Sequence, residues 1–374
     1  MIKELSEQSN VFPNESVKVW KDQGKKVIGF MCAYVPEEVI YAAGMLPFRI
    51  RGTGCTRMNR SDAVMSHYSC SFARSCLEFA MDGTYDFLDG LIAVDSCAQM
   101  HRLYDNWRFK AKLPFMHLLN LPHKNSAAAI AWYRDEIATL IRSMEKVFGV
   151  NITDENLVRA IEVYNETRML LRSMYDLRKS ENPTVTGSKS QSIVLAATSM
   201  PREQYNDLLK AYLGKIRSVE PIRGFRARLM LVGSSLDDPA FIKIIEDQGG
   251  LVVTDALCFG SRYFWEPVDK EGDLLLSLSK SLLSRPKCPR MMDEHVSLFA
   301  FIMDMVQNFN VDGIIFQKMQ YCNLWGGESL FLEKKLKDAK IPFLSIEREQ
   351  VLNNAAQIAT RVEAFIEMIE GVIE

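Results

Sequence analysis

Residues Phe87 to Cys97 read FLDGLIAVDSC, and Val311 to Cys322 read VDGIIFQKMQYC. Both stretches begin near an Asp-Gly turn, continue with a run of apolar residues and end in a cysteine. A short apolar run bounded by turn residues predicts a buried strand. Because ligands gather beyond the carboxyl ends of strands in open parallel sheets, Cys97 and Cys322 are predicted to lie at reactive positions. A free cysteine at a strand end also packs as a small hydrophobic residue, so this alternative stays open for each one alone.

Each stretch is followed by a predicted helix and by a second strand that opens with a Pro-Phe pair. These second strands read LPFMHLL at 113–119 and IPFLSI at 341–346. A strand, a helix and a further strand in this order predict a βαβ unit with parallel strands. The chain is therefore predicted to be an α/β protein with two Rossmann-like parallel-sheet lobes joined by a helical segment.

The helical segment is predicted at 126–222, where helical periodicity continues without a strand signal. Prolines divide it, and helices should end before Pro183 and before Pro201 because the residue before a proline disfavours the helical conformation. We predict an N-terminal α/β lobe at 1–125 and a C-terminal α/β lobe at 223–374. A chain of 374 residues is long enough for lobes that each bury a core.

The composition is that of an ordinary globular protein, with 48% hydrophobic and 25% charged residues and a formal net charge of −2. This balance gives no electrostatic reason to expect nucleic acid as a partner. No apolar run approaches the roughly 20 residues that span a bilayer, and the N-terminal residues have no apolar signal core. We expect a cytoplasmic protein without a membrane partner.

The cysteines are predicted to be free thiols or metal ligands, because the cytoplasm keeps thiols reduced. No Cys-x-x-Cys pair is present, so the common zinc and ferredoxin spacings are absent, and a metal site would have to be assembled by the fold from separate cysteines. Cys70 stands near the start of a helix predicted at 68–81, where the helix dipole favours a thiolate. The eight cysteines are Cys32, Cys55, Cys70, Cys76, Cys97, Cys258, Cys288 and Cys322.

Two loops are candidates for ligand binding. Residues 51–62 read RGTGCTRMNRSD and are either a solvated surface loop or a clamp for an anionic group. Residues 258–269 read CFGSRYFWEPVD and are either a binding loop or an aromatic plug between the lobes. His101 is interpreted as a surface or hydrogen-bonded histidine rather than a ligand.

The sequence lacks the motifs that mark several enzyme classes. There is no Walker-type phosphate loop, no Gly-x-Gly-x-x-Gly after a strand and no Gly-x-Ser-x-Gly elbow. A cysteine nucleophile stays possible. Three cysteines at converging element ends, however, resemble a cage of thiolates more than the single nucleophile that acyl transfer requires.

Three segments carry a family resemblance: GFMCAYVPEEVIYAAGMLPFRIRG at 29–52, YSCSFARSCLEFAMDGTYDFLDGLIAVDSCAQMHRLYDNW at 68–107 and DGIIFQKMQYCNLWGGESLFLEKKLKDAKIPFLSIE at 312–347. They resemble the iron-sulfur subunits of 2-hydroxyacyl-CoA dehydratases, which are lyases, and of class I benzoyl-CoA reductases. The similarity covers nearly the whole chain.

The resemblance implies that Cys70, Cys97 and Cys322 each give one thiolate to a [4Fe-4S] cluster and leave one iron open. In this family a strongly reducing electron, supplied by a homodimeric iron-sulfur ATPase, drives either dehydration of a 2-hydroxyacyl-CoA or dearomatisation of benzoyl-CoA. The resemblance also implies a homologous second subunit and an oxygen-sensitive protein. The alternatives are a non-catalytic electron-relay or scaffold subunit, and a zinc-binding structural protein.

The sequence departs from the family pattern at several places. Ala98 follows Cys97 where many relatives have aspartate, and Asn323 follows Cys322. Cys32 resembles the extra cysteines of related double-cubane proteins, but nothing in the sequence ties it to Cys288, which favours a single cubane and a structural role for Cys32. Contacts with CoA are hypothesised at the arginines of 49–60 and in the loop after Cys258.

Overall fold

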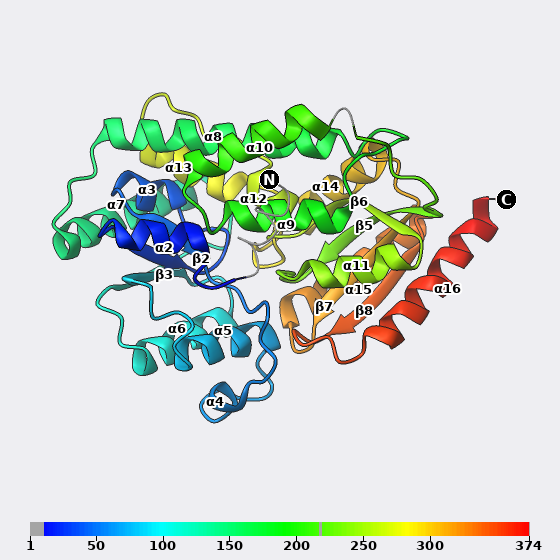
Figure 1. Cartoon of the computed structure of the whole chain (residues 1–374), viewed down its shortest axis with the longest axis horizontal. Coiled ribbons are helices and arrows are strands. Elements are labelled where there is room, and N and C mark those ends of the chain that lie inside the picture. The colour runs from blue at the N-terminus through cyan, green and yellow to red at the C-terminus, as the bar shows by residue number, and fades with distance from the viewer. Residues whose placement is uncertain (1–10, 217–218, 374) are drawn as a thin grey trace.

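Two α/β lobes lie side by side in the computed structural model, which describes residues 11–216 and 219–373 (Figure 1). Each lobe is built on a four-stranded parallel sheet, and the orders are β2-β1-β3-β4 and β6-β5-β7-β8. These are the same order, since the second sheet repeats the first with every number raised by four. The predicted α/β class, with two Rossmann-like parallel-sheet lobes, is confirmed.

The strands are short and largely buried. In the N-terminal sheet they are β1 (Val27–Phe30), β2 (Leu46–Arg49), β3 (Gly90–Val94) and β4 (Met116–Leu119). In the C-terminal sheet they are β5 (Ala227–Gly233), β6 (Gly250–Ala256), β7 (Gly313–Met319) and β8 (Phe343–Arg348). β3 and β7 are the two strands predicted from the opening stretches, and each is paired in parallel on both sides.

Alternate residues of each strand point into different hydrophobic cores, as the period of two in a strand requires. Leu229 and Leu231 of β5 pack below α11 and α16, whereas Met230 and Val232 pack with α9, α10 and α14 on the other face. Helices therefore cover both faces of each sheet, which explains why the strands read as continuous apolar runs. The helices of the N-terminal part are α2 (Glu15–Asp22), α3 (Glu37–Ala42), α4 (Asn59–Asp62), α5 (Ser71–Met81) and α6 (Ala98–Lys110).

The segment predicted to be helical contains α7 (Ala127–Phe148), α8 (Asp154–Asp176), α9 (Gly187–Ala197) and α10 (Arg202–Ile216). The helices end before Pro183 and before Pro201, as predicted. Their packing is divided, because α7 contacts β4 while α9 contacts β6 and α11. Remaining helices are α11 (Pro239–Asp247), α12 (Ser261–Phe264), α13 (Leu274–Ser284), α14 (His295–Asn308), α15 (Asn323–Asp338) and α16 (Ala355–Ile373).

One segment of the C-terminal sequence packs on the N-terminal lobe. α13 lies against α7, and its Leu278 and Leu282 join the core beneath β1 and β3. The C-terminal sequence thus contributes to the core of the N-terminal lobe. α8 and α10 run along one side of both lobes (Figure 1). The boundaries after residues 125 and 222 remain a prediction.

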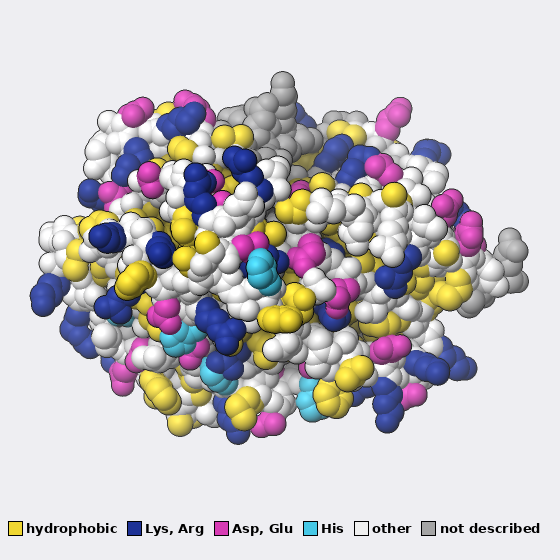
Figure 2. Space-filling model, turned by 90° about the horizontal axis from the view of Figure 1, so that it is seen from below, with side chains coloured by type: hydrophobic (Ala, Val, Ile, Leu, Met, Phe, Trp, Pro, Cys, Tyr) yellow, Lys and Arg dark blue, Asp and Glu magenta, His cyan; other side chains and the backbone are white. Residues whose placement is uncertain are grey.

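The last helix is separated from the last strand by a short loop, because β8 ends at Arg348 and α16 starts at Ala355. Across the described ranges, 11–216 and 219–373, no helix combines the length and apolarity that crossing a bilayer requires. The face in Figure 2 carries acidic and basic side chains interspersed with scattered hydrophobic ones, in line with the near-zero net charge.

Candidate functional site: a thiol-lined chamber between the lobes

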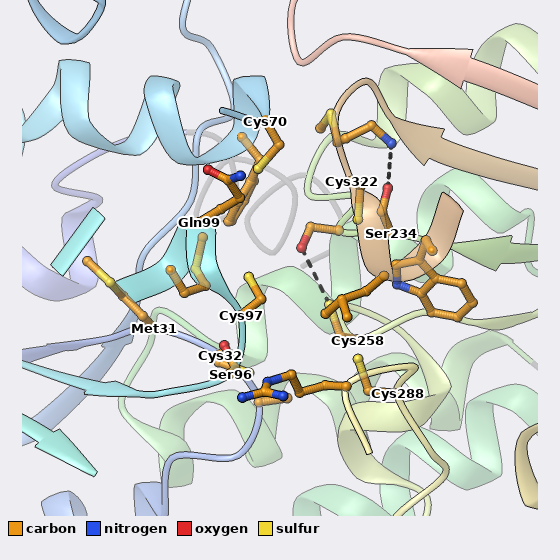
Figure 3. A pocket seen from close by; sticks show the side chains of 18 of the residues that line it. Met31, Cys32, Cys70, Ser96, Cys97, Gln99, Ser234, Cys258, Cys288 and Cys322 are labelled. Atoms are coloured by element: carbon orange, nitrogen blue, oxygen red, sulfur yellow. Dashed lines mark hydrogen bonds between the residues drawn. The ribbon is translucent and has the colours of Figure 1, made fainter. Parts of the chain in front are cut away.

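A cavity of about 350 Å³ lies where the carboxyl ends of the two sheets face each other. It opens at the places where the strand order reverses, between β1 and β3 in one sheet and β5 and β7 in the other. Seven of the eight cysteines line it, and only Cys55 does not. Figure 3 shows thiols reaching this space from the N-terminal lobe on one side and the C-terminal lobe on the other.

Three of the thiols belong to residues that immediately precede a helix, and we call them the helix-start thiols. Cys70 caps α5, Cys97 caps α6 and Cys322 caps α15. The backbone amide three residues later, at Ala73, Met100 and Trp325 respectively, lies near each sulfur and lowers the pKa of its thiol. The first turn of a helix has amides without partners and a partial positive charge, so all three positions suit a sulfur that carries negative charge.

Burial opposes ionisation of these thiols in the absence of a bound cation. Burial raises the pKa of Cys70 to about 12 and that of Cys97 to about 11, although the helix amides lower both. Burial also raises the pKa of Cys322. Such thiols are poor nucleophiles near neutral pH, because the thiolate is the reactive form. A bound metal deprotonates a coordinating thiol, so metal coordination suits this environment better than a cysteine nucleophile does.

Three further thiols reach the chamber from loops, and we call them the loop thiols: Cys32 after β1, Cys258 after β6 and Cys288 between α13 and α14. The Cys258 sulfur lies 3.8 Å from the hydroxyl oxygen of Ser235. Cys288 accepts a hydrogen bond from the Arg262 guanidinium. No sequence pattern groups these three, whose only shared property is their place around the cavity.

Cys32 has a backbone conformation that side chains other than glycine rarely adopt. Its φ is +79°, and Tyr321, the residue before Cys322, has a φ of +65°. Non-glycine residues in the left-handed region cost free energy and cluster at functional sites. Burial raises the pKa of the Cys32 thiol, and the nearby backbone amide of Tyr34 opposes this rise. These observations weigh against the structural role that the sequence favoured for Cys32.

The seventh chamber cysteine, Cys76, is fully buried in the middle of α5, as expected for a core residue. Cys55 is buried outside the chamber, where its sulfur lies 3.1 Å from the carbonyl oxygen of Arg57. His101 is half exposed and lies 3.5 Å from a carboxylate oxygen of Asp95. The interpretation of His101 as a surface histidine is therefore confirmed.

The loop after Cys258 is the aromatic plug rather than an open binding loop. Phe259 and Phe264 are each only 1% exposed. Phe259 packs in the core of the N-terminal lobe and lies edge-on to Phe72 of α5. The loop thus fixes the Cys258 backbone against the opposite lobe.

The hypothesis that Arg51 contacts CoA is wrong for this residue. Arg51 is 0% exposed, and its guanidinium lies 4.8 Å from the Phe12 ring and 3.4 Å from the Ser199 hydroxyl oxygen. Residues distant in the sequence thus enclose this part of the loop, which the polar composition of 51–62 did not indicate. Arg57, in the same loop, is exposed.

A buried ionic network holds the two loops that carry Cys32 and Cys258. The Glu37 carboxylate, at the start of α3, accepts hydrogen bonds from Arg202 at 2.7 Å and from the Tyr263 hydroxyl at 3.0 Å. Beside it, Glu38 pairs with Arg168 of α8. Because α3 follows Cys32 and α12 follows Cys258, Glu37 connects the two loops through α10 and α12.

Thiols are the candidate metal ligands of this chamber. Among the residues that the structure describes, no three His, Cys, Asp or Glu side chains converge as ligands of one metal ion. The three helix-start thiols come from three different helices and line one cavity. In an iron-sulfur cluster each thiolate binds a different iron.

The fold and the cavity together define a class: a two-lobed parallel α/β protein with an interlobe site built from cysteines at strand and helix ends. Comparison with known proteins agrees. The family model described as "2-hydroxyglutaryl-CoA dehydratase, D-component" matches residues 32–369. The chain belongs to this family, and with it to the enzyme subunits of the dehydratase and benzoyl-CoA reductase type.

Three relatives illustrate the range of the family. The chain is 28% identical to one of the subunits of the benzoyl-CoA reductase of Thauera aromatica, over 95% of this chain and 94% of the relative. It is 28% identical to the beta subunit of (R)-2-hydroxyglutaryl-CoA dehydratase of Acidaminococcus fermentans, over 96% of each. It is 25% identical to the beta subunit of (R)-phenyllactyl-CoA dehydratase of Clostridium sporogenes, over 94% of each. The predicted family is confirmed.

Proposed function

We propose that this chain is the iron-sulfur subunit of an ATP-activated, low-potential enzyme that acts on CoA thioesters. The observation that carries the proposal is that Cys70, Cys97 and Cys322, far apart in the sequence, line one chamber from the starts of three helices. These thiols would hold a [4Fe-4S] cluster, which supplies single electrons of low potential.

The chain's own residues perform three tasks around such a cluster. The helix-start thiols bind iron, and their helix amides stabilise the sulfur charge. Phe259, Met31 and Leu103 exclude water from the walls of the chamber. The Glu37 network holds the loops of the two lobes in register. Exclusion of water suits a cluster of low reduction potential, because the reduced cluster would otherwise lose its electron to water or oxygen.

The reaction is either radical dehydration of a 2-hydroxyacyl-CoA or reductive dearomatisation of benzoyl-CoA. Relatives of both kinds match with similar identity, so the comparisons do not favour one of them. A product assay separates the two reactions, through formation of a 2-enoyl-CoA in the first case and of a cyclic diene in the second. A relay or scaffold subunit would reduce its cluster without binding acyl-CoA.

The proposed enzyme includes two partners, a homologous second subunit and a homodimeric iron-sulfur ATPase. Two of the relatives carry names of beta subunits of dehydratases, which supports a partner subunit. Tyr68 and Tyr321 lie beside the helix-start thiols with their rings 5.4 Å apart, and Tyr68 is 74% exposed. Exposed rings at such a place are typical of a protein interface. A reducing compartment, the cytoplasm, suits the free thiols.

A second candidate function follows from the loop thiols. Cys32, Cys258 and Cys288 supply a second set of three thiols in the same chamber. Six ligands would hold a double-cubane cluster, and the chain would then be the reducing component of a double-cubane enzyme rather than a thioester dehydratase. The left-handed backbone at Cys32, with a φ of +79°, supports this candidate, because such non-glycine positions cluster at functional sites.

Anaerobic purification followed by iron and sulfide analysis tests both candidates. A single cubane predicts about four irons per chain, and a double cubane predicts about eight. In either case Cys97→Ser should lose iron, while Cys55→Ser, the matched change at the cysteine outside the chamber, should not. Unchanged iron content in Cys97→Ser would refute the ligand assignment. If Cys258→Ser also loses iron, the double-cubane candidate is favoured; if it does not, the single cubane is.

A further inference from the structure

Four arginines line the chamber together with the thiols, and they come from both lobes. Three of them are almost completely buried, with exposed fractions of 2% for Arg49, 4% for Arg262 and 7% for Arg285. Arg290 is partly buried at the edge of the cavity. A guanidinium stays protonated in proteins, so the chamber carries four fixed positive charges.

The hydrogen-bond partners of these four guanidiniums are neutral. Within the described part of the chain, none of them forms an ion pair with a carboxylate. They donate instead to backbone carbonyl oxygens: Arg49 to Cys258 at 2.7 Å, Arg262 to Pro286 at 3.1 Å, Arg285 to Ala33, and Arg290 to Asp95 at 3.3 Å. The Nε atoms of Arg49, Arg285 and Arg290 are buried without a hydrogen-bond partner in the described structure.

The nearest buried carboxylates are already in use. Glu37 is paired with Arg202, and Glu38 is paired with Arg168. Buried charges without a partner are strongly unfavourable, since desolvation is not offset by attraction. The four guanidiniums have carbonyl oxygens, aromatic rings and a histidine as neutral partners, but no counter-charge. The charge of the chamber therefore matches an anionic occupant better than a neutral one.

We infer that the four guanidiniums are the fixed counter-charge of a thiolate-ligated cluster in this chamber and that they set its reduction potential, with Arg262 as the principal positioning residue. This inference rests on the proposed function. We assign this role to Arg262 because its guanidinium contacts the Cys288 thiol and lies beside Cys258. The Trp325 ring lies 5.7 Å from the guanidinium and holds it on the opposite side.

The direction of the effect follows from charge. A cluster that accepts one electron from a reductant becomes more negative by one unit, and a nearby guanidinium favours that reduced state. In the double-cubane candidate, where Cys288 is a ligand, the hydrogen bond from Arg262 to its sulfur acts in the same direction. The arginines thus make the cluster easier to reduce, which helps an ATP-driven donor to transfer an electron to it.

A redox titration of the anaerobic holoprotein, followed by electron paramagnetic resonance and with a europium(II) chelate as reductant, tests the inference. Arg262→Gln removes the charge and should move the midpoint potential to more negative values. Arg262→Lys keeps the charge but loses the planar set of guanidinium donors, and should shift the midpoint potential less. Arg142→Gln removes the same charge from the exposed side of α7 and should leave the potential unchanged. Arg290→Gln, at the partly exposed edge, is the second test if Arg262→Gln does not fold.

The outcomes separate the two proposals. A wild-type protein without iron contradicts the proposed function itself. A wild-type cluster whose potential is the same in Arg262→Gln and Arg290→Gln leaves the proposed function intact and overturns the counter-charge role. A potential that changes when acetate or phosphate is added to the wild type, but not to Arg262→Gln, also overturns it, because the arginines would then bind a small anionic ligand.

Discussion

The helix-start thiols and the loop thiols face the same cavity but are held there by different means. Cys70, Cys97 and Cys322 are fixed by their own helices, and each sulfur meets an amide of the first turn. The loop thiols depend on contacts made by distant residues, such as Arg49 with the Cys258 carbonyl oxygen and Arg285 with that of Ala33. The first set is therefore a local property of the chain, and the second set is a property of how the lobes meet.

Removal of the cluster should affect the two sets unequally, and this is the largest effect that we expect. Without an occupant, the chamber keeps four guanidiniums and loses their counter-charge, so stability should fall by several kcal/mol. Hydrogen exchange of the anaerobic holoprotein and of the chelator-treated apoprotein should show lost protection at 257–264 and 286–291. Protection at 98–101 and 323–326 should change less. Equal loss in both groups would contradict the distinction between local and interlobe support.

Substitution of Glu37 should weaken the loop set alone. In Glu37→Gln the buried Arg202 loses its charged partner and the contact between the Cys32 and Cys258 loops is weakened, at an expected cost of about 3 kcal/mol in the free energy of unfolding. Denaturant unfolding measures this. Glu15→Gln, which removes a solvent-exposed ion pair with Lys18 at 3.5 Å, is the control and should change stability by less than about 0.5 kcal/mol.

Substitution of Ser235 tests one contact of the loop set. In Ser235→Ala the Cys258 sulfur loses its neighbouring hydroxyl at 3.8 Å, and because such contacts to sulfur are weak, stability should fall by about 1 kcal/mol. Iron content should stay unchanged, since the thiol itself remains. Loss of iron in this variant would mean that the hydroxyl does more than support Cys258.

Asp89 lies at the end of the N-terminal sheet that faces away from the chamber. Its substitution should therefore affect neither the helix-start thiols nor the loop thiols. Burial alone would raise the pKa of its carboxyl, but hydrogen bonds from Lys21, the Val27 amide and Lys26 outweigh burial and lower the pKa. A carboxyl whose pKa is lower in the folded state stabilises the protein above its unfolded pKa, roughly 4, and loses that contribution on further acidification. Asp89→Asn should therefore cost about 1 kcal/mol at pH 7 and progressively less below about pH 4. Iron content should stay at the wild-type value; a change in it would contradict the separation of this end of the sheet from the chamber.

Local sequence patterns were sufficient to predict the two parallel-sheet lobes and the place of the helix-start thiols. An apolar run after an Asp-Gly turn leaves few structures other than a buried strand, and a cysteine at its end is held within a few residues of the next helix. These are short-range constraints, so β3, β7, Cys97 and Cys322 could be predicted from them, and the family resemblance added Cys70 as their companion.

The rest of the chamber depends on tertiary contacts that no local pattern reveals. Cys32, Cys258 and Cys288 meet because α13 crosses to the N-terminal lobe and the plug at Phe259 enters its core, and neither contact leaves a periodic signal in the sequence. Arg51, which was expected in a polar loop, is buried for the same reason. Local propensity acts over a few residues, whereas burial in this chamber is set by contacts between residues more than 200 positions apart, such as the Arg49 guanidinium with the Cys258 carbonyl oxygen.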